Sequence, residues 1–263
     1  MGSIAIVVLA AAVAYALLIL WLETRQSRGE SEGERKAFKG VEWMLLVTAH
    51  PDDESMFFLP TINAFPNRQD VYVLCLSKGD FDGLGKVREK ELLDCCSGIL
   101  ALKPGNVLLR DDEKLRDGPN NHWPLTTVAS SVSEAIKNIR DSRPKPGKGA
   151  LVTFDVAGIS GHVNHVAVSK GVQHLYSSGE HPEVEFYQLE SVNVFRKFSS
   201  FLDILPSLVY DCDVLLVTTD LPLSYDCMAA HASQFVWYRK LFILFSRYSF
   251  INTLHRIPLA TPP

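Results

Sequence analysis

The chain has 263 residues, of which 47% are hydrophobic and 21% charged, and this composition excludes a disordered or collagen-like protein. The formal net charge is −4, and the excess acid lies in the part expected to be globular, which argues against a nucleic-acid-binding protein because such a domain would be basic. The five cysteines are an odd number without metal-ligand spacing, so we expect core thiols rather than disulfides.

An uncharged run covers residues 4–22 near the start of the chain. A helix of this length would span about 28 Å, close to the hydrocarbon thickness of a bilayer. We expect a transmembrane anchor over residues 1–22, with a secretory leader or a buried core helix as the alternatives. The leader is disfavoured because no Lys or Arg precedes the run. The Lys and Arg residues that follow it predict that the rest of the chain is cytoplasmic.

Residues 23–40 are rich in charge and cannot bury apolar area, so we expect a solvated linker there. The globular domain is expected to cover residues 41–263. Within it, apolar runs of strand length alternate with longer helical patterns. The expected strands are 43–49, 71–76, 107–109, 150–154, 184–189 and 214–217, and the expected helical segments are 55–65, 86–102, 126–139, 162–176 and 226–254.

Strands that are continuously apolar and alternate with helices are typical of a parallel sheet covered on both faces. We therefore predict a three-layer, Rossmann-like α/β fold with a mostly parallel sheet. Ligands of such folds bind beyond the carboxyl ends of the strands, so polar residues that follow a strand are the first candidates for function.

The first candidate cluster follows the first expected strand and contains His50, Asp52, Asp53 and Glu54. An imidazole and adjacent carboxylates at the end of a buried strand are costly to desolvate unless they bind something. The three acids could instead be capping charges of the next helix, but that interpretation does not account for His50.

The second cluster, His162 to His165, opens a helix after the fourth expected strand. The two histidines are three residues apart and would share one helix face, although such a pair alone is a weak signal. Together with the first cluster, two His and one Asp provide the nitrogen and oxygen ligands of a catalytic zinc site, with one position left for water.

Three segments, 49–54, 161–165 and 231–234, resemble in this order the signatures of the PIG-L/LmbE-like family of zinc-dependent de-N-acetylases. The resemblance covers roughly residues 41–254. With the N-terminal apolar run and the basic aromatic stretch that begins at Trp237, the chain is most similar to the eukaryotic branch of the family. That resemblance implies hydrolysis of the N-acetyl group of N-acetylglucosaminyl-phosphatidylinositol, the second step of glycosylphosphatidylinositol (GPI) anchor synthesis, at the cytoplasmic face of the endoplasmic reticulum membrane.

Position by position, the resemblance implies that His50, Asp53 and His165 bind Zn²⁺, that Asp52 is the general base, and that His162 is the electrophilic or acid partner. The metal would acidify a water molecule, Asp52 would take its proton, and a protonated His162 would help to stabilise the oxyanion. Either Asp52 or His162 would protonate the leaving amine. Iron or cobalt would fit the same ligands.

Two further positions resemble family residues that contact the substrate. Arg88 follows the glycine-rich loop 79–85 and could pair with the inositol phosphate through its bidentate fork; a salt bridge with Glu91 is the alternative. Asp117 resembles the position that accepts hydrogen bonds from sugar hydroxyls, or it belongs to an Asp-Gly turn.

His231 and Gln234 lie three residues apart in an expected helix, where they could orient a metal ligand or form a buried polar pair. The aromatic and basic stretch 235–254 could lie in the membrane interface and present the lipid-borne sugar, or it could be a core helix with a basic outer face.

The leading hypothesis is therefore a metal-dependent N-deacetylase that acts on a glycolipid. A catalytically inactive, membrane-tethered protein of the same fold that binds glycolipids or phosphoinositides would not need all five of the clustered His and Asp residues. A metallophosphatase would usually need more carboxylates to hold two ions.

Overall fold

The computed structural model describes residues 38–145 and 147–257, together with residues 13, 15–18, 20, 21 and 24. The expected anchor (residues 1–22) and linker (residues 23–40) lie largely outside the described residues. In the part of the chain that is described, no helix has both the length and the apolar character needed to cross a membrane.

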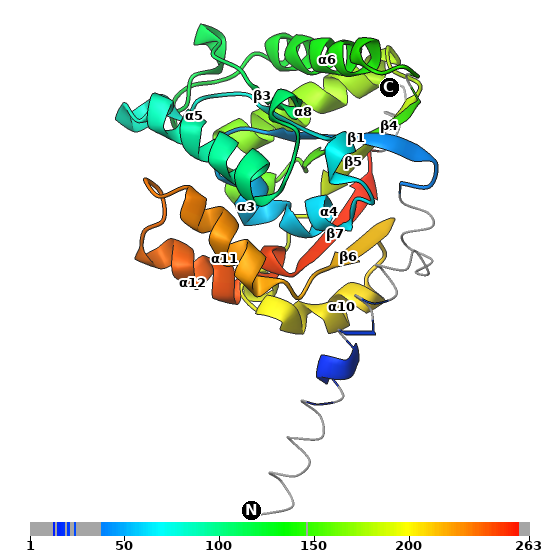
Figure 1. The fold of residues 1–263 in the computed structure, drawn as a ribbon, viewed down its shortest axis with the longest axis vertical. Helices are drawn as coiled ribbons and strands as arrows, with labels where there is room; N and C mark the ends of the chain where they lie inside the picture. Colours follow the sequence, from blue (N-terminus) through cyan, green and yellow to red (C-terminus); the bar gives the residue numbers. More distant parts are fainter. Residues whose placement is uncertain are drawn as a thin grey trace, which may run out of the picture.

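A seven-stranded sheet forms the centre of the molecule, in the order β3-β2-β1-β4-β5-β7-β6 (Figure 1). The strands are β1 (Val41–Thr48), β2 (Val71–Cys75), β3 (Val107–Leu109), β4 (Lys148–Phe154), β5 (Val184–Leu189), β6 (Val214–Val217) and β7 (Ile251–Arg256). The first five pair in parallel, whereas β7 is antiparallel to both β5 and β6. The predicted α/β fold with a mostly parallel sheet is confirmed.

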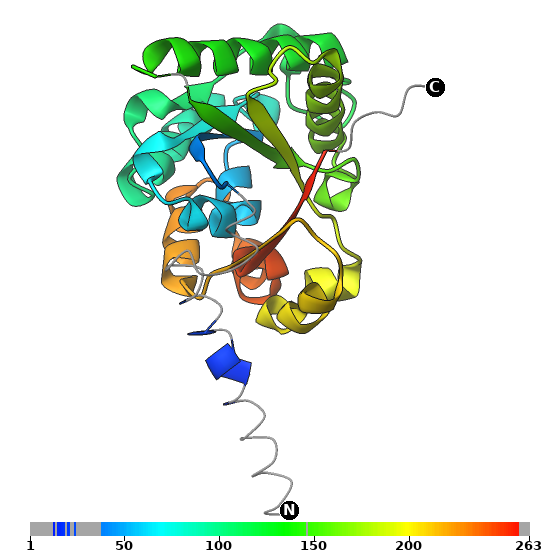
Figure 2. The same cartoon turned by 90° about the vertical axis from the view of Figure 1, so that its right-hand side faces the viewer.

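Helices cover both faces of the sheet. Between residues 38 and 257, the α-helices that the structure describes are α3 (Asp53–Phe57), α4 (Leu59–Ala64), α5 (Gly85–Leu93), α6 (Leu125–Ser142), α7 (Gly158–Gly161), α8 (Val163–Ser178), α9 (Val194–Lys197), α10 (Ile204–Val209), α11 (Leu221–Ala230) and α12 (Trp237–Phe245). Shorter 3₁₀ turns are η1 (Arg68–Asp70), η2 (Asp80–Asp82), η4 (Pro104–Asn106), η5 (Glu113–Leu115), η6 (Ser200–Asp203) and η7 (Arg247–Ser249), and η3 (Asp94–Ile99) is a π-helical turn. Figure 2 shows α6 and α8 on one face and α3, α4 and α11 on the other.

β1 shows how burial on both faces of the sheet requires a continuously apolar strand. Residues 43–47 of this strand are fully buried, because helices pack against both of its faces. Gly149 on the neighbouring β4 leaves room for the indole of Trp43, since a Cβ at this glycine would lie 2.2 Å from the Trp43 ring.

The expected helix over residues 226–254 is wrong in its second half. α12 ends at Phe245, and residues 251–256 form β7, which lies inside the sheet between β5 and β6. Asn252 fixes this strand to the helices on one face: its Oδ1 accepts a hydrogen bond from the Thr61 hydroxyl at 2.7 Å, and its Nδ2 donates to the Phe57 carbonyl at 2.8 Å. Long-range pairing of this kind overrides the local helical pattern.

The strand order places a topological switch point between β1 and β4. The chain leaves β1 toward β2 on one side and leaves β4 toward β5 on the other side. The segments that follow β1 and β4 therefore meet at the carboxyl edge of the sheet, where ligands bind in folds of this class. Both predicted clusters, 50–54 and 162–165, lie in these two segments.

Candidate active site

The turn between β1 and α3 is tight and strained. Asp52 is the N-cap residue of α3 and has φ 121° and ψ −21°, a backbone conformation that residues other than glycine rarely adopt. The Asp53 carboxylate holds the turn, because its Oδ2 accepts hydrogen bonds from the backbone N–H groups of Ala49 (3.0 Å) and His50 (2.9 Å). Asp52 and His50 are thereby held at the end of β1.

The turn after β4 positions the second cluster. Gly158 (φ 56°) and Ile159 (φ 65°) both have left-handed backbones, and Asp155 stabilises the turn by accepting hydrogen bonds from the N–H of Gly158 and the hydroxyl of Ser191. A Cβ at Gly158 would lie 2.9 Å from the Cβ of His165, so a glycine is needed for this close approach.

His165 presents a lone pair to Asp53. Its Nδ1 lies 3.2 Å from the carbonyl oxygen of Gly158, which can only accept, so Nδ1 carries the hydrogen. Its Nε2 then faces Asp53 Oδ1 at 3.1 Å. Two acceptors at this distance need a proton or a metal ion between them. The ring also stacks on Phe154, with centroids 4.0 Å apart and planes at 2°.

The structure brings together the four residues predicted around the metal. Ring nitrogens of His50, His162 and His165 lie within 4.8 Å of one another, and Asp53 Oδ2 is 3.8 Å from His50 Nδ1. His162 caps α8 and is exposed, whereas the other three are buried. Imidazole nitrogens with one carboxylate are donors that suit zinc, so the residues present fit this metal.

His50 is oriented from its other side by Asp117. His50 Nε2 lies 3.1 Å from Asp117 Oδ1 and 2.9 Å from the amide nitrogen of Asn164, and this amide donates to Asp117 Oδ1 at 3.3 Å. Burial lowers the pKa of His50, but the hydrogen bond to Asp117 and the charge of Asp53 outweigh burial and raise it. Burial raises the pKa of Asp117, but His50 and Arg88 bring it below its usual range.

Asp53 is ionised and His162 is neutral, because the pKa values of both side chains are lowered. Burial opposes ionisation of Asp53, but His165 and His50 hold its pKa well below the usual range. His162 is exposed on one side, but partial burial of its ring, reinforced by the neighbouring His165 and His50, lowers the pKa of His162 to about 4. The Nδ1 of His162 accepts a hydrogen bond from the N–H of Asn164 at 3.3 Å. The neutral ring therefore carries its hydrogen on Nε2.

Two guanidinium groups flank the carboxylate of Asp52. Arg239 Nη2 on α12 lies 3.1 Å from Asp52 Oδ2, and Arg88 Nη2 lies 3.8 Å from Asp52 Oδ1. Arg88 is fixed by hydrogen bonds to the carbonyls of Gly79 (2.8 Å) and Pro51 (2.9 Å). These contacts, with Asp117 Oδ2 at 3.7 Å, replace the alternative pairing with Glu91.

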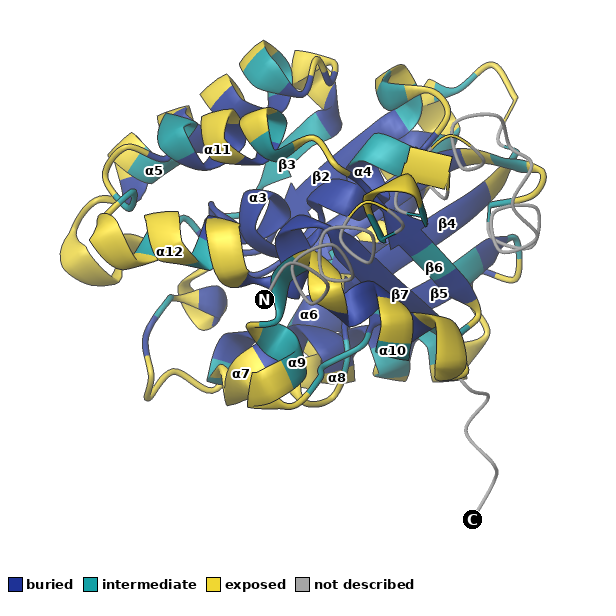
Figure 3. Ribbon diagram, turned by 90° about the horizontal axis from the view of Figure 1, so that it is seen from below, coloured by how far each residue is buried: buried dark blue, intermediate teal, exposed yellow. Residues whose placement is uncertain are grey.

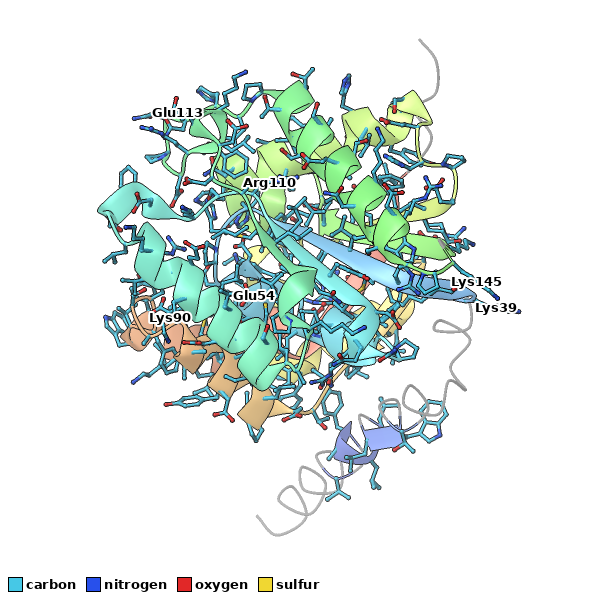
Figure 4. All side chains as sticks on the ribbon, turned by 45° about the horizontal axis from the view of Figure 1, so that its top comes forward. Lys39, Glu54, Lys90, Arg110, Glu113 and Lys145 are labelled. Carbon is cyan, nitrogen blue, oxygen red and sulfur yellow. The ribbon has the colours of Figure 1, made fainter. Side chains whose placement is uncertain are left out.

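Glu54 and His231 form a buried pair behind the Asp52 turn. His231 Nε2 lies 2.6 Å from Glu54 Oε1, and neither side chain is exposed. Glu54 Oε2 accepts a hydrogen bond from the N–H of Asp52 at 3.2 Å. Figure 4 shows Glu54 in the interior of the molecule, whereas Lys90 and Glu113 lie at its periphery. His231 thus acts on the strained turn through Glu54.

Gln234 lies away from the histidine cluster. Its amide donates to Glu91 Oε2 at 3.4 Å, and the same carboxylate accepts from the N–H and hydroxyl of Ser233, both at 2.7 Å. These contacts fix the segment after α11 to α5.

The predicted thiols are confirmed, because all five cysteines are free and four of them are buried.

Sequence reasoning missed three participants in the site. By pattern alone, Arg239 belongs only to the basic aromatic stretch, Glu54 belongs to the first cluster without a role of its own, and Asp155 stands in no motif. The one local signal was the position of Arg239, which follows the third signature by five residues and opens an amphipathic helix.

Comparisons with known proteins agree with this geometry. The family model described as PIG-L, GlcNAc-PI de-N-acetylase, matches residues 45–176. A probable N-acetylglucosaminyl-phosphatidylinositol de-N-acetylase of Schizosaccharomyces pombe is 42% identical over 238 residues, which cover 86% of this chain and 90% of that protein. The N-acetylglucosaminyl-phosphatidylinositol de-N-acetylase of Bos taurus is 37% identical over 251 residues, with coverage of 94% and 95%.

Among solved structures, the N,N'-diacetylchitobiose deacetylase from Pyrococcus horikoshii is similar in fold. The TM-score is 0.54 at 15% sequence identity, and the match covers 85% of this chain and 86% of that chain. The family model and the relatives together show that the chain belongs to the PIG-L family of GlcNAc-PI de-N-acetylases.

Proposed function

We propose that the chain hydrolyses the N-acetyl group of N-acetylglucosaminyl-phosphatidylinositol and releases acetate and glucosaminyl-phosphatidylinositol. Membership of the family and relatives at 42% and 37% identity support the reaction and its substrate. The observation that carries the chemistry is the convergence of His50, Asp53, His162 and His165 beside Asp52.

His50, Asp53 and His165 are the proposed ligands of a zinc ion. Such an ion would lower the pKa of a water molecule and polarise the acetamide carbonyl. The protein orients these ligands from behind: Gly158 fixes the ring of His165, and Asp117 fixes the ring of His50. Partners of this kind strengthen metal binding.

Asp52 is the proposed general base. It takes a proton from the attacking water as the water oxygen bonds to the carbonyl carbon. The expected protonated His162 is replaced by a neutral ring near pH 7, since the pKa of His162 is lowered to about 4. Its Nε2–H can still donate to the carbonyl oxygen as negative charge develops there. Asp52 then delivers the proton to the nitrogen as the C–N bond breaks, so that the amine and acetate leave.

Asp117 and Arg88 are the proposed substrate-binding residues. Asp117 lies at the wall of a pocket of about 340 Å³ that also contains Lys78, Arg110 and Arg116. Asp80, Asp111 and Asp112 complete its ionisable lining, so carboxylates outnumber cations there. A pocket with this balance suits sugar hydroxyl groups, which donate hydrogen bonds to carboxylates.

Acetate release tests this function directly. The full chain in neutral detergent, loaded with about one zinc ion per chain, is expected to release acetate from N-acetylglucosaminyl-phosphatidylinositol. Removal of the metal by a chelator should abolish release, and added zinc should restore it. An inactive glycolipid-binding protein would bind the lipid but release no acetate, and that result would overturn the proposal.

We further propose that the protein acts at the cytoplasmic face of the endoplasmic reticulum membrane, held there by the N-terminal run and α12. Large apolar side chains are exposed on α12 and on the segment from α9 to α10: Trp237 is 72% exposed, and Phe195 and Val209 are each 85% exposed. Figure 3 shows exposed residues of α9, α10 and α12 around one face of the molecule. Tyr15 packs on Phe201 beside this face, with ring centroids 5.7 Å apart.

Contact of α12 with lipid can be measured by tryptophan fluorescence. In vesicles that contain brominated phosphatidylcholine, Trp237 is expected to be quenched, because aromatic rings favour the interface. Both proteins carry Trp21→Phe, because Trp21 lies in the expected anchor and would also be quenched, and the buried Trp43 and Trp123 provide an internal unquenched signal. Trp237→Phe should therefore reduce the quenched fraction. An equal quenched fraction in both proteins would place α12 away from the bilayer.

A further inference from the structure

Arg239 covers the oxygen of Asp52 that would accept a proton. Its Nη2 is 3.1 Å from Asp52 Oδ2, and Asp52 is almost fully buried while the Arg239 side chain is 26% exposed. Its other terminal nitrogen contacts the sulfur of Met56. In this arrangement the proposed base is occupied by a cation that solvent, or a bound ligand, can reach.

Arg239 and Arg88 differ in how firmly they are held. Both terminal nitrogens of Arg88 donate to backbone carbonyls, and only 14% of its side chain is exposed. The contacts of Arg239 are to side chains: Asp52, Met56 and the neighbouring ring of Tyr238, 6.0 Å away. An anionic group that arrives at the site can therefore exchange with Asp52 as the partner of Arg239 without disturbing the backbone.

The proposed substrate carries such a group. Its phosphodiester links the inositol ring to the acyl chains, and so lies between the sugar and the lipid. The pocket beside Asp117 is lined by four carboxylates and three cations, and its carboxylates can accept hydrogen bonds from the sugar hydroxyl groups. On the opposite side, α12 carries exposed apolar residues and places Arg239 next to Asp52. A guanidinium binds phosphate oxygens through two parallel hydrogen bonds.

We propose that Arg239 binds the phosphodiester of the substrate and in doing so leaves Asp52, so that the base is freed when a phosphorylated substrate is bound. This inference rests on the proposed function and adds a determinant of specificity to it. The phosphate then has two effects: it anchors the substrate, and it removes the cation from the atom that must accept a proton.

Two water-soluble substrates separate these effects from lipid binding: N-acetylglucosaminyl-inositol phosphate, and N-acetylglucosaminyl-inositol, which lacks phosphate. With the full chain in neutral detergent, Arg239→Gln is expected to lower kcat/KM for the phosphorylated substrate by about 10- to 100-fold, mainly through KM. It should raise kcat/KM for the phosphate-free substrate, because Asp52 no longer has a competing partner. Arg239→Lys should be intermediate, since a lysine keeps the charge but lacks the fork.

Arg140→Gln is the matched control. Arg140 Nη1 pairs with Glu183 Oε1 at 2.8 Å on the partly exposed surface, close to the start of β5 and so at the opposite edge of the sheet. This variant loses the same charge and should keep the ratio of the two kcat/KM values.

The outcomes are distinguishable. An equal loss of kcat/KM on both soluble substrates after Arg239→Gln would mean that Arg239 only positions Asp52. A loss of kcat/KM confined to the lipid-linked substrate would mean that Arg239 senses the lipid. Either result overturns the inference. A wild-type chain that cleaves none of these substrates would overturn the proposed function, and the inference with it.

Discussion

Replacement of Asp52 by asparagine is expected to lower kcat by about 10²- to 10⁴-fold, the usual contribution of a positioned general base, while the bound metal is retained. An amide cannot take the proton of the attacking water. Asparagine is preferred to alanine as the test, because the backbone of Asp52 has φ 121° and asparagine tolerates positive φ better than most residues. The measurement is single-turnover acetate release, with metal content determined on the same sample.

Asp53→Asn is the companion variant, and it should fail in a different way. Asp53 is the neighbouring carboxylate and faces both His165 and His50, so its replacement is expected to reduce metal content. Excess zinc should then restore part of the activity of Asp53→Asn but none of that of Asp52→Asn. If Asp52→Asn turns over substrate at the wild-type rate, the proton is taken by another group and the assignment of Asp52 is wrong.

The part of the site that was predictable from the sequence lies at strand ends. β1 is buried on both faces, so its apolar run was visible locally, and the polar residues that follow it could be assigned to the carboxyl edge of a parallel sheet. The spacing of His162 and His165 was visible in the same way. Their proximity to His50 and Asp53 follows from the adjacency of β1 and β4: the three histidines lie together, and Asp53 faces both His50 and His165.

The parts that were not predictable depend on contacts between distant segments. Residues 251–254 could belong to a helix or a strand by pattern alone, and the choice is made by pairing with β5 and β6 and by the hydrogen bonds of Asn252 to α3 and α4. The position of Arg239 five residues after the third signature does not reveal its contact with Asp52, because the two residues are 187 positions apart. Long-range contacts of this kind are set by tertiary packing, to which a local pattern is blind.

The buried pair of Glu54 and His231 is expected to contribute strongly to stability, because neither side chain is exposed. Loss of one partner leaves the other buried and uncompensated, which costs about 3–5 kcal/mol. His231→Ala should therefore lower the free energy of unfolding by this amount in chemical denaturation. The double variant Glu54→Gln/His231→Ala should recover part of the loss, because the uncompensated carboxylate is gone. If the effects of Glu54→Gln and His231→Ala on the free energy of unfolding add up to that of the double variant, the two side chains do not interact.

The pair also predicts a direction for the pH dependence of stability. Burial lowers the pKa of His231, but the charge of Glu54 and the hydrogen bonds to Cys95 and Glu54 outweigh burial and raise this pKa well above its ordinary value. Burial raises the pKa of Glu54. A raised pKa in the folded state gives a stabilisation that is complete below the unfolded value, about 6.5 for histidine, and is lost as the pH rises through the folded value. The stability difference between wild type and the double variant should thus decrease from pH 6 toward alkaline pH, and a flat difference would mean that His231 binds no extra proton.

Because Glu54 also accepts the hydrogen bond from the Asp52 backbone, the same variants should lose acetate release at temperatures where they remain folded.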